Sequence, residues 1–279
     1  MAAENPPIAP AELVRKTVEN ELRAPNDSSR FMFRARKQTA DGSQTRVYVQ
    51  TREATAGMLV ALDDKPLTPE QKQSEEGHLQ YLLKDPDELR RKQRQEKDDT
   101  ERISRIVRAL PNAFVYEYSG TEAGTLGTGK IGDELLRLKF RPNPKYDPPT
   151  RVEQVLTGMA GYLLIDANRQ RIAKIDGTLV KDVGFGWGIF GHLDRGGQFQ
   201  VEQGEVGGSG WEITRMNLSF TGKILLFKTI AIKSEEVFSN FRRVPPNTTF
   251  AEGVEMLKAE LARLAQGGSE TARAEGKSH

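Results

Sequence analysis

The residues that could do chemistry are sparse, and the clearest motif is a glycine-rich run that ends in lysine. Residues 124–130 read GTLGTGK and match the pattern G-x-x-x-x-G-K of phosphate-binding loops. Such a loop needs Ser or Thr next, for magnesium, and a helix whose N-terminus faces the phosphate. Here Ile131 follows, and residues 134–141 favour a strand. We therefore interpret the motif as a hairpin loop and not as a nucleotide site.

Metal and nucleophile chemistry have few candidate residues. The chain has no cysteine, and its three histidines, His78, His192 and His279, lie far apart in sequence. No imidazole or thiolate metal centre is expected, and no serine lies in a G-x-S-x-G elbow. Asp166 and Asp176 fall where strands are expected to end, which is typical of turns. A carboxylate pair in a cleft stays open as an alternative, but the sequence predicts neither an enzyme nor a cofactor.

The charge balance gives no general attraction to nucleic acid or to anionic membranes. The 279 residues include 41 basic and 39 acidic side chains. The basic run at 90–94 lies among acidic residues at helical spacing, which indicates a solvated helix face with local ion pairs. No run approaches the roughly 18 apolar residues of a membrane-spanning helix. The start AAENPPIAP resembles a mature exported chain, so we expect a periplasmic or otherwise exported protein whose signal peptide has been removed.

Hydrophobic spacing divides the chain into a few helices and many short strands. Between 67 and 110 the period is helical with a break at Asp85-Pro86, which predicts a two-helix insertion. From 158 to 243, short apolar runs alternate with turn formers, which predicts a meandering antiparallel sheet. The other expected elements are helices at 10–24, 151–156 and 248–265 and strands at 30–37, 45–51, 56–61, 113–119 and 134–141.

These elements predict an α+β fold that is mainly β. We expect a curved antiparallel half-barrel of about ten to eleven strands with a helical lid or insertion. Residues 1–9 are expected to be a flexible arm, residues 10–265 a single domain that carries the insertion 67–110, and residues 266–279 a disordered tail. The segment 131–140 is apolar on both faces, which implies burial on both sides, as in a sheet covered by helices on one side and curled around an interior on the other.

The order of elements resembles the family of periplasmic lipoprotein carriers that includes LolA and LolB, with the related sensor protein RseB. The points of likeness are the leading helix, the helical insertion, and the stretches GYLLIDANRQRIAKIDG at 161–177 and WEITRMNLSFTGKILLFK at 211–228. The resemblance implies an incomplete antiparallel barrel with helices as a lid over its apolar concave face. It also implies non-catalytic binding or carriage of a lipid or lipoprotein acyl chain in the bacterial envelope.

The candidate wall of such a ligand site consists of aromatic and aliphatic residues on the expected strands. An acyl chain would gain about 0.8 kcal/mol for each CH₂ group that it buries against them. For each residue core packing is the alternative, because only one register of a strand faces the interior. The candidates are Phe31, Phe33, Val47, Val49, Met58, Phe114, Tyr116, Leu136, Leu138, Leu163, Ile165, Phe199 and Trp211.

Two functional classes follow from this interpretation. In the first, the partner is a lipid or an acylated protein, held in an apolar cavity. In the second, the chain is a protein–protein sensor or assembly module of the envelope, like RseB, and its own side chains fill the concave face. No nucleic-acid partner is expected in either class.

Overall fold

The computed structural model describes residues 8–23, 29–185, 191–224 and 228–275. The chain divides into two compact units, which are described separately below. Unit 1 comprises Met1–Asp27 and Asp98–Val237, and unit 2 comprises Ser28–Lys97 and Phe238–His279. One helix and one strand contribute residues to both units.

Unit 1 contains most of the strands. Its elements are α1 (Pro10–Arg23), the C-terminal part of α3 (Pro86–Ala113), β5 (Phe114–Ala123), β6 (Glu134–Pro142), α4 (Arg151–Gln154), the 3₁₀ helix η2 (Val155–Gly158), β7 (Met159–Asp166), β8 (Ile172–Leu179), β9 (Val183–Phe185), β10 (Gly191–Leu193), β11 (Gln198–Val206), β12 (Gly210–Ile224) and the first part of β13 (Lys228–Val244).

Unit 2 is smaller and combines a short meander with two helices. Its elements are β1 (Arg30–Thr39), β2 (Gly42–Gln50), β3 (Thr55–Leu62), β4 (Lys65–Pro66), α2 (Pro69–Lys84), the N-terminal part of α3, the last part of β13 and α5 (Phe250–Glu275).

The strands follow one hydrogen-bonded order, β4-β3-β2-β1-β13-β12-β11-β8-β7-β6-β5, with the pair β9 and β10 attached beside β12. The pairs β1–β2, β2–β3, β5–β6, β6–β7, β7–β8, β8–β11, β11–β12 and β12–β13 are all antiparallel. The order has two ends, β4 and β5, and so it does not close on itself. The α+β class and the antiparallel sheet predicted from the sequence are therefore confirmed. The strands that the sequence does not reveal are short, such as β4 with two residues and β9 with three.

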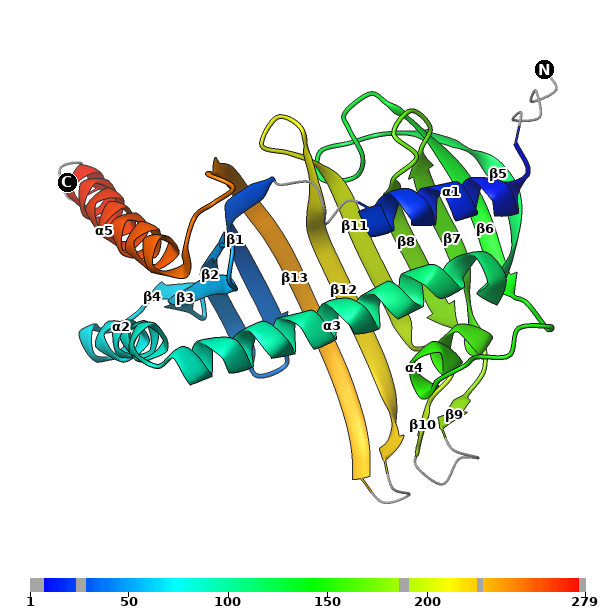
Figure 1. The fold of residues 1–279 in the computed structure, drawn as a ribbon, viewed down its shortest axis with the longest axis horizontal. Coiled ribbons are helices and arrows are strands. Elements are labelled where there is room, and N and C mark those ends of the chain that lie inside the picture. The colour runs from blue at the N-terminus through cyan, green and yellow to red at the C-terminus, as the bar shows by residue number, and fades with distance from the viewer. Residues whose placement is uncertain (1–7, 24–28, 186–190, 225–227, 276–279) are drawn as a thin grey trace. The chain divides into compact units, whose positions relative to one another are not determined.

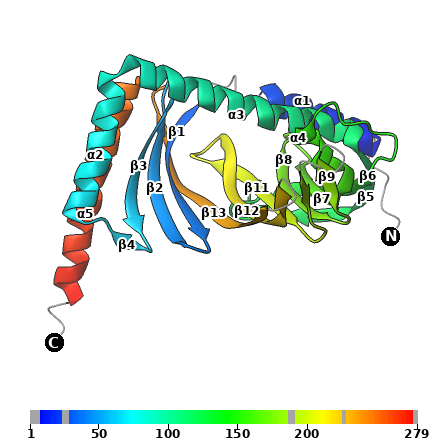
Figure 2. The same ribbon diagram turned by 90° about the horizontal axis from the view of Figure 1, so that it is seen from below.

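One face of the unit 1 sheet is apolar and is covered by helices. Figures 1 and 2 show α1, α4 and the C-terminal part of α3 on this side of β5 to β8. The buried residues of α1 include Leu13, Val14 and Val18, which share one side of the helix at the spacing of an amphipathic stripe. They pack with buried strand residues such as Leu138 and Leu163. We call this continuous cluster between helices and sheet the apolar layer.

The core of unit 2 lies between its strands and two helices. In Figures 1 and 2, α2 and α5 lie side by side, and both contact β3. Thr68 begins α2 as part of a capping box: its hydroxyl accepts from the Gln71 backbone N–H, and the Gln71 side chain accepts from the Thr68 backbone N–H. The cluster contains Leu79 from α2 and Val254 and Leu257 from α5. These helices are held by packing as well as by local capping.

The last helix is longer than the sequence predicts. We expect it to end at Ala265, but α5 continues to Glu275, so residues 266–275 are helical and do not belong to a disordered tail. Its apolar stripe ends near Leu264, which explains why hydrophobic spacing places the boundary too early. Residues 276–279 and residues 1–7 of the expected arm lie outside the described residues.

Glu260 on α5 gives unit 2 a pH-dependent contribution to stability. Hydrogen bonds from Arg263 and, from β13, Arg242 hold the pKa of the Glu260 carboxyl at about 2, against an ordinary value of 4.5. We expect Glu260→Gln to lower the free energy of unfolding by about 1 kcal/mol at pH 7. The deficit should shrink as the pH falls from 4.5 toward 2, because the wild-type carboxylate is then lost too.

Denaturant unfolding at pH 7 and pH 3 measures this effect. Glu255→Gln is the matched control, because Glu255 lies on the same helix in an exposed pair with Lys258 and should change stability little. Equal stability of the wild type and Glu260→Gln at pH 7 would contradict the prediction.

Candidate functional site

The expected wall residues are divided between the two units. In unit 1, five of them are buried in the apolar layer, and Leu136 and Phe199 pack against it as partly buried residues. Trp211 packs instead with Leu135 and Leu164, a small cluster outside the apolar layer. The five buried members are Phe114, Tyr116, Leu138, Leu163 and Ile165.

The other five candidates belong to unit 2. Val47, Val49 and Met58 are buried in the cluster that α2 and α5 cover. Phe31 and Phe33 form an aromatic group on β1: Phe33 stacks on Tyr48 with ring centroids 5.4 Å apart, and Phe31 meets Phe241 edge to face at 6.1 Å. Figure 1 shows β1, the strand that carries both phenylalanines, within the unit 2 sheet.

The apolar layer of unit 1 is closely packed around Gly177. A Cβ atom added to Gly177 would lie 2.8 Å from the Met159 sulfur and 3.4 Å from Phe140. The hydroxyl of Tyr116 donates to the carbonyl of Leu110 at 2.7 Å, which places the polar end of this ring at the C-terminal turn of α3. Side chains therefore fill this part of the space between the sheet and its helices.

The opposite face of the same sheet carries many charged side chains beside the small buried cluster of Leu135, Leu164 and Ala173. Successive residues of a strand point to opposite faces, so Arg137 and Tyr162 lie away from the layer that holds Leu138 and Leu163. A network of contacting polar side chains crosses this face from strand to strand. Its members are Glu122 on β5, Arg137 on β6, Tyr162 on β7, Lys174 on β8, Glu202 on β11, Arg215 on β12 and Glu235 on β13.

Adjacent members of this network contact each other through ion pairs or ring contacts. Arg137 bonds to Glu122 at 2.7 Å and lies over the Tyr162 ring, 4.1 Å from its centroid. Lys174 lies 3.2 Å from Glu202, which is also paired with Arg215. Asp176, which also contacts Lys174, belongs to β8 itself. The expectation that it lies in a turn is therefore wrong, because strand β8 extends through 177 before it ends at Leu179.

The glycine-rich motif forms the β5–β6 hairpin loop, as predicted. No helix follows it, because β6 begins at Glu134. The loop returns to the sheet at β11: the Gly129 N–H donates to Gln203 at 2.8 Å, and the Glu205 N–H donates to Gly129 at 3.1 Å. Gly129 has a φ of +73°, and a Cβ on Gly204 would lie 2.8 Å from the Gly129 oxygen. The glycines therefore permit a close backbone approach and not phosphate binding.

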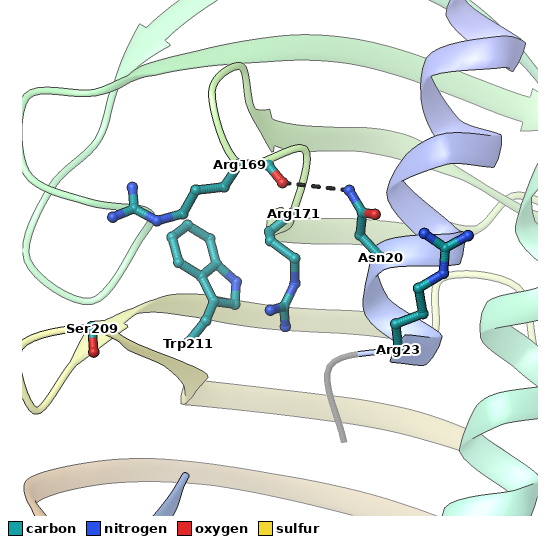
Figure 3. A pocket seen from close by; sticks show the side chains of 6 residues that line it. All are labelled: Asn20, Arg23, Arg169, Arg171, Ser209 and Trp211. Atoms are coloured by element: carbon teal, nitrogen blue, oxygen red, sulfur yellow. Dashed lines mark hydrogen bonds between the residues drawn. The ribbon is translucent and has the colours of Figure 1, made fainter. Parts of the chain in front are cut away.

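A pocket of about 360 Å³ lies in unit 1 where α1 ends, beside the β7–β8 turn and the β11–β12 hairpin. Figure 3 shows Trp211 beside Arg171, with Arg23 and Asn20 across from them on α1. The Arg169 and Arg171 guanidinium carbons lie 5.6 and 5.9 Å from the indole ring centre. The lining residues are Asn20, Arg23, Arg169, Arg171, Ser209 and Trp211.

Carboxylates fix two of the pocket's arginines. Glu21 accepts from Nε and Nη2 of Arg171 at 2.9 and 3.0 Å and from the Ile172 backbone N–H at 2.7 Å. On the same helix, the Asn20 amide donates to the carbonyl of Gln170 at 3.2 Å. These bonds attach the end of α1 to the β7–β8 turn and orient the Arg171 side chain.

Arg169 lies at the centre of three carboxylates. It bonds to Asp133 at 2.9 Å and Glu205 at 2.5 Å, and it lies 3.7 Å from Asp166. Asp166 is fully buried, and its Oδ1 accepts from the backbone N–H groups of Asn168 and Arg169 at 3.0 and 2.7 Å. The turn role predicted for Asp166 is therefore confirmed. The structure adds that Asp166 also supports one wall of the pocket.

Glu212, next to Trp211 on β12, is a partly buried carboxyl whose charge is costly. Burial raises its pKa to about 7 from an ordinary 4.5, although the positive charge of Arg171 acts in the opposite direction. The folded state thus holds a proton that the unfolded state has released, and stability falls as the pH rises from 4.5 to 7. We expect Glu212→Gln to raise the free energy of unfolding by about 1–2 kcal/mol at pH 8.

A measurement of Glu212→Gln at low pH is the control for this prediction. At pH 4 both the glutamate and the glutamine are neutral, so urea unfolding should give nearly equal stabilities there. A variant that is equally stabilised at pH 4 and pH 8 would show that the effect comes from shape and not from charge.

Sequence reasoning did not identify the pocket as a site. Arg169 and Arg171 stand two apart after a strand end, which is the available local signal, but Arg23 and Asn20 lie about 150 residues earlier. Among the residues that the structure describes, no group of three or more His, Cys, Asp or Glu could hold a metal ion. In the same residues, no helix combines the length and apolarity needed to cross a membrane.

Comparison with known proteins adds no family to these observations. No family model matches the chain, and no curated protein matches it at a significant level.

Proposed function

We propose that the protein is a non-catalytic binder or carrier of an apolar ligand, a lipid or the acyl chain of a lipoprotein, in the bacterial envelope. The proposed site is the apolar layer of unit 1. The observation that carries the proposal is the asymmetry of this sheet: one face holds the continuous apolar layer beneath α1, α3 and α4, whereas the polar network crosses the other.

Within the helical cover, α3 is attached through few side chains, which supports its displacement by a ligand. In the unit 1 part of α3, Leu110 and Ala113 are buried, while Ile106 and Val107 are partly buried. Ile103 on the same helix is 62% exposed. Each CH₂ group of an acyl chain gains about 0.8 kcal/mol of transfer free energy when it is buried. A chain of ordinary length could therefore replace the contacts that α3 makes with the layer.

Lipid carriage is tested first by extraction of the natively purified protein with organic solvent, followed by mass spectrometry. A carrier should yield an acyl species in stoichiometric amount. Leu136→Gln, at the partly buried border of the apolar layer, should lower the yield. Ile232→Gln on β13 is the matched control, because Ile232 is about half exposed and lies outside the layer.

If the extract contains no lipid and added acyl ligands fail to bind the folded protein, the carrier proposal is wrong.

A protein–protein sensor or assembly module is the second candidate, and exposed aliphatic residues on the β5–β6 loop favour it. Leu126 is 90% exposed and Ile131 67% exposed, beside the exposed Lys130. A photoreactive amino acid at position 126 should then form an adduct with one defined envelope protein in cells. That result together with a lipid-free extract would favour the module over the carrier.

A further inference from the structure

Two segments of the chain contribute neighbouring residues to the pocket and to the apolar layer. On α1, Arg23 lines the pocket while its neighbour Leu22 packs against the layer. On the other wall, Arg171 lines the pocket while Ile172 is buried in the layer. The Ile172 carbonyl also accepts from the Trp211 indole N–H at 3.0 Å. The end of α1 and the start of β8 therefore contribute residues both to the pocket and to the proposed acyl site.

The three arginines differ in how far their charge is already matched. Arg169 and Arg171 are held by the carboxylates described above, with ion-pair distances from 2.5 to 2.9 Å. Arg23 is 74% exposed, and its pair with the exposed Glu19 is long, at 3.4 Å. Such exposed pairs contribute little. The charge of Arg23 is thus the one that an incoming anion could neutralise, beside guanidinium groups that are already oriented.

We propose that this pocket binds the phosphate group of an anionic lipid whose acyl chains enter the apolar layer. This inference rests on the proposed function. Guanidinium groups match phosphate oxygens in geometry and charge, and the pocket's size falls in the usual range for small ligands. Trp211 supplies an apolar surface in the wall of the pocket, since its ring packs against Leu135 and Leu164.

Fluorescence of Trp211 reports occupation of the pocket once Trp187, the other tryptophan of the sequence, is replaced by Phe. Three probes are titrated at constant ionic strength: inorganic phosphate, a short-chain phosphatidic acid, and the diacylglycerol with the same chains. We expect phosphatidic acid to bind about tenfold more tightly than diacylglycerol. Arg23→Gln should remove most of that difference, whereas Arg15→Gln on the exposed side of the same helix should not.

The outcomes separate this inference from the function on which it rests. If both lipids bind equally and Arg23→Gln changes neither, the phosphate site is wrong while apolar binding stands. If inorganic phosphate binds but neither lipid does, the lipid assignment and the proposed function are both overturned. Arg23 is exposed, so its variant should keep the wild-type circular dichroism spectrum, and loss of binding can be assigned to the pocket.

Discussion

Leu163→Ala is expected to lower the free energy of unfolding by about 3–4 kcal/mol, the largest effect that we expect from a single truncation. Leu163 is 1% exposed at the centre of β7 and belongs to the apolar layer, between the neighbouring strands β6 and β8. The substitution removes buried methyl groups and leaves a space that the surrounding strands can close only in part. Guanidinium unfolding of the wild type and the variant measures the difference.

Ile232→Ala is the control for this prediction. Ile232 is also a strand residue of unit 1, but it is about half exposed, and the cost should stay within about 0.5 kcal/mol. A Leu163→Ala cost below about 1 kcal/mol would mean that the layer is loosely packed at this position.

Arg169→Met is expected to destabilise the protein by about 2–4 kcal/mol. The variant keeps most of the side-chain volume but removes the cation that three carboxylates share, one of which, Asp166, is fully buried. The cost arises mainly because these carboxylates then repel each other without a partner. Thermal unfolding at neutral pH, compared between wild type and variant, measures the effect.

A second substitution tests the origin of that cost. Asp133→Asn in the Arg169→Met background removes one of the unpartnered charges and should recover part of the loss. Arg215→Met is the matched single variant, because Arg215 pairs with Glu235 on an exposed part of the polar network and should cost less. If Arg169→Met and Arg215→Met lower the free energy of unfolding equally, then the group of carboxylates around Arg169 contributes no more to stability than the exposed pair of Arg215 and Glu235.

Much of the fold could be predicted from local patterns. The helix predicted from Pro10 is α1, which is described through Arg23, and the strand predicted from Arg30 is β1. Asp85-Pro86 divides the insertion into α2 and α3 as the proline position indicates. These signals are local because caps, prolines and apolar periodicity act within one or two turns of the chain.

The site could be predicted only in part, because its chemistry depends on contacts between distant segments. Alternation places Leu138 and Leu163 on one face, but it cannot distinguish a cavity wall from a core that α1 covers. The bidentate pair between Arg171 and Glu21 joins residues 150 positions apart. No spacing rule relates them, since the partner of a charged side chain is set by the tertiary fold.

The two ends of the strand order have a consequence for how the chain behaves at high concentration. An unpaired edge strand is a template for polymerisation, because its free N–H and C=O groups can bind a strand of another molecule. At one end, the two-residue β4 pairs with Ala61 and Leu62 of β3, and further along β3 the N–H groups of Thr55 and Leu59 donate to the Glu96 and Glu75 carboxylates. At the other end, β5 is interrupted near Gly120, where its register with β6 shifts and φ is +119°. Neither edge offers a long regular ladder, so the chain should resist fibre formation through strand addition.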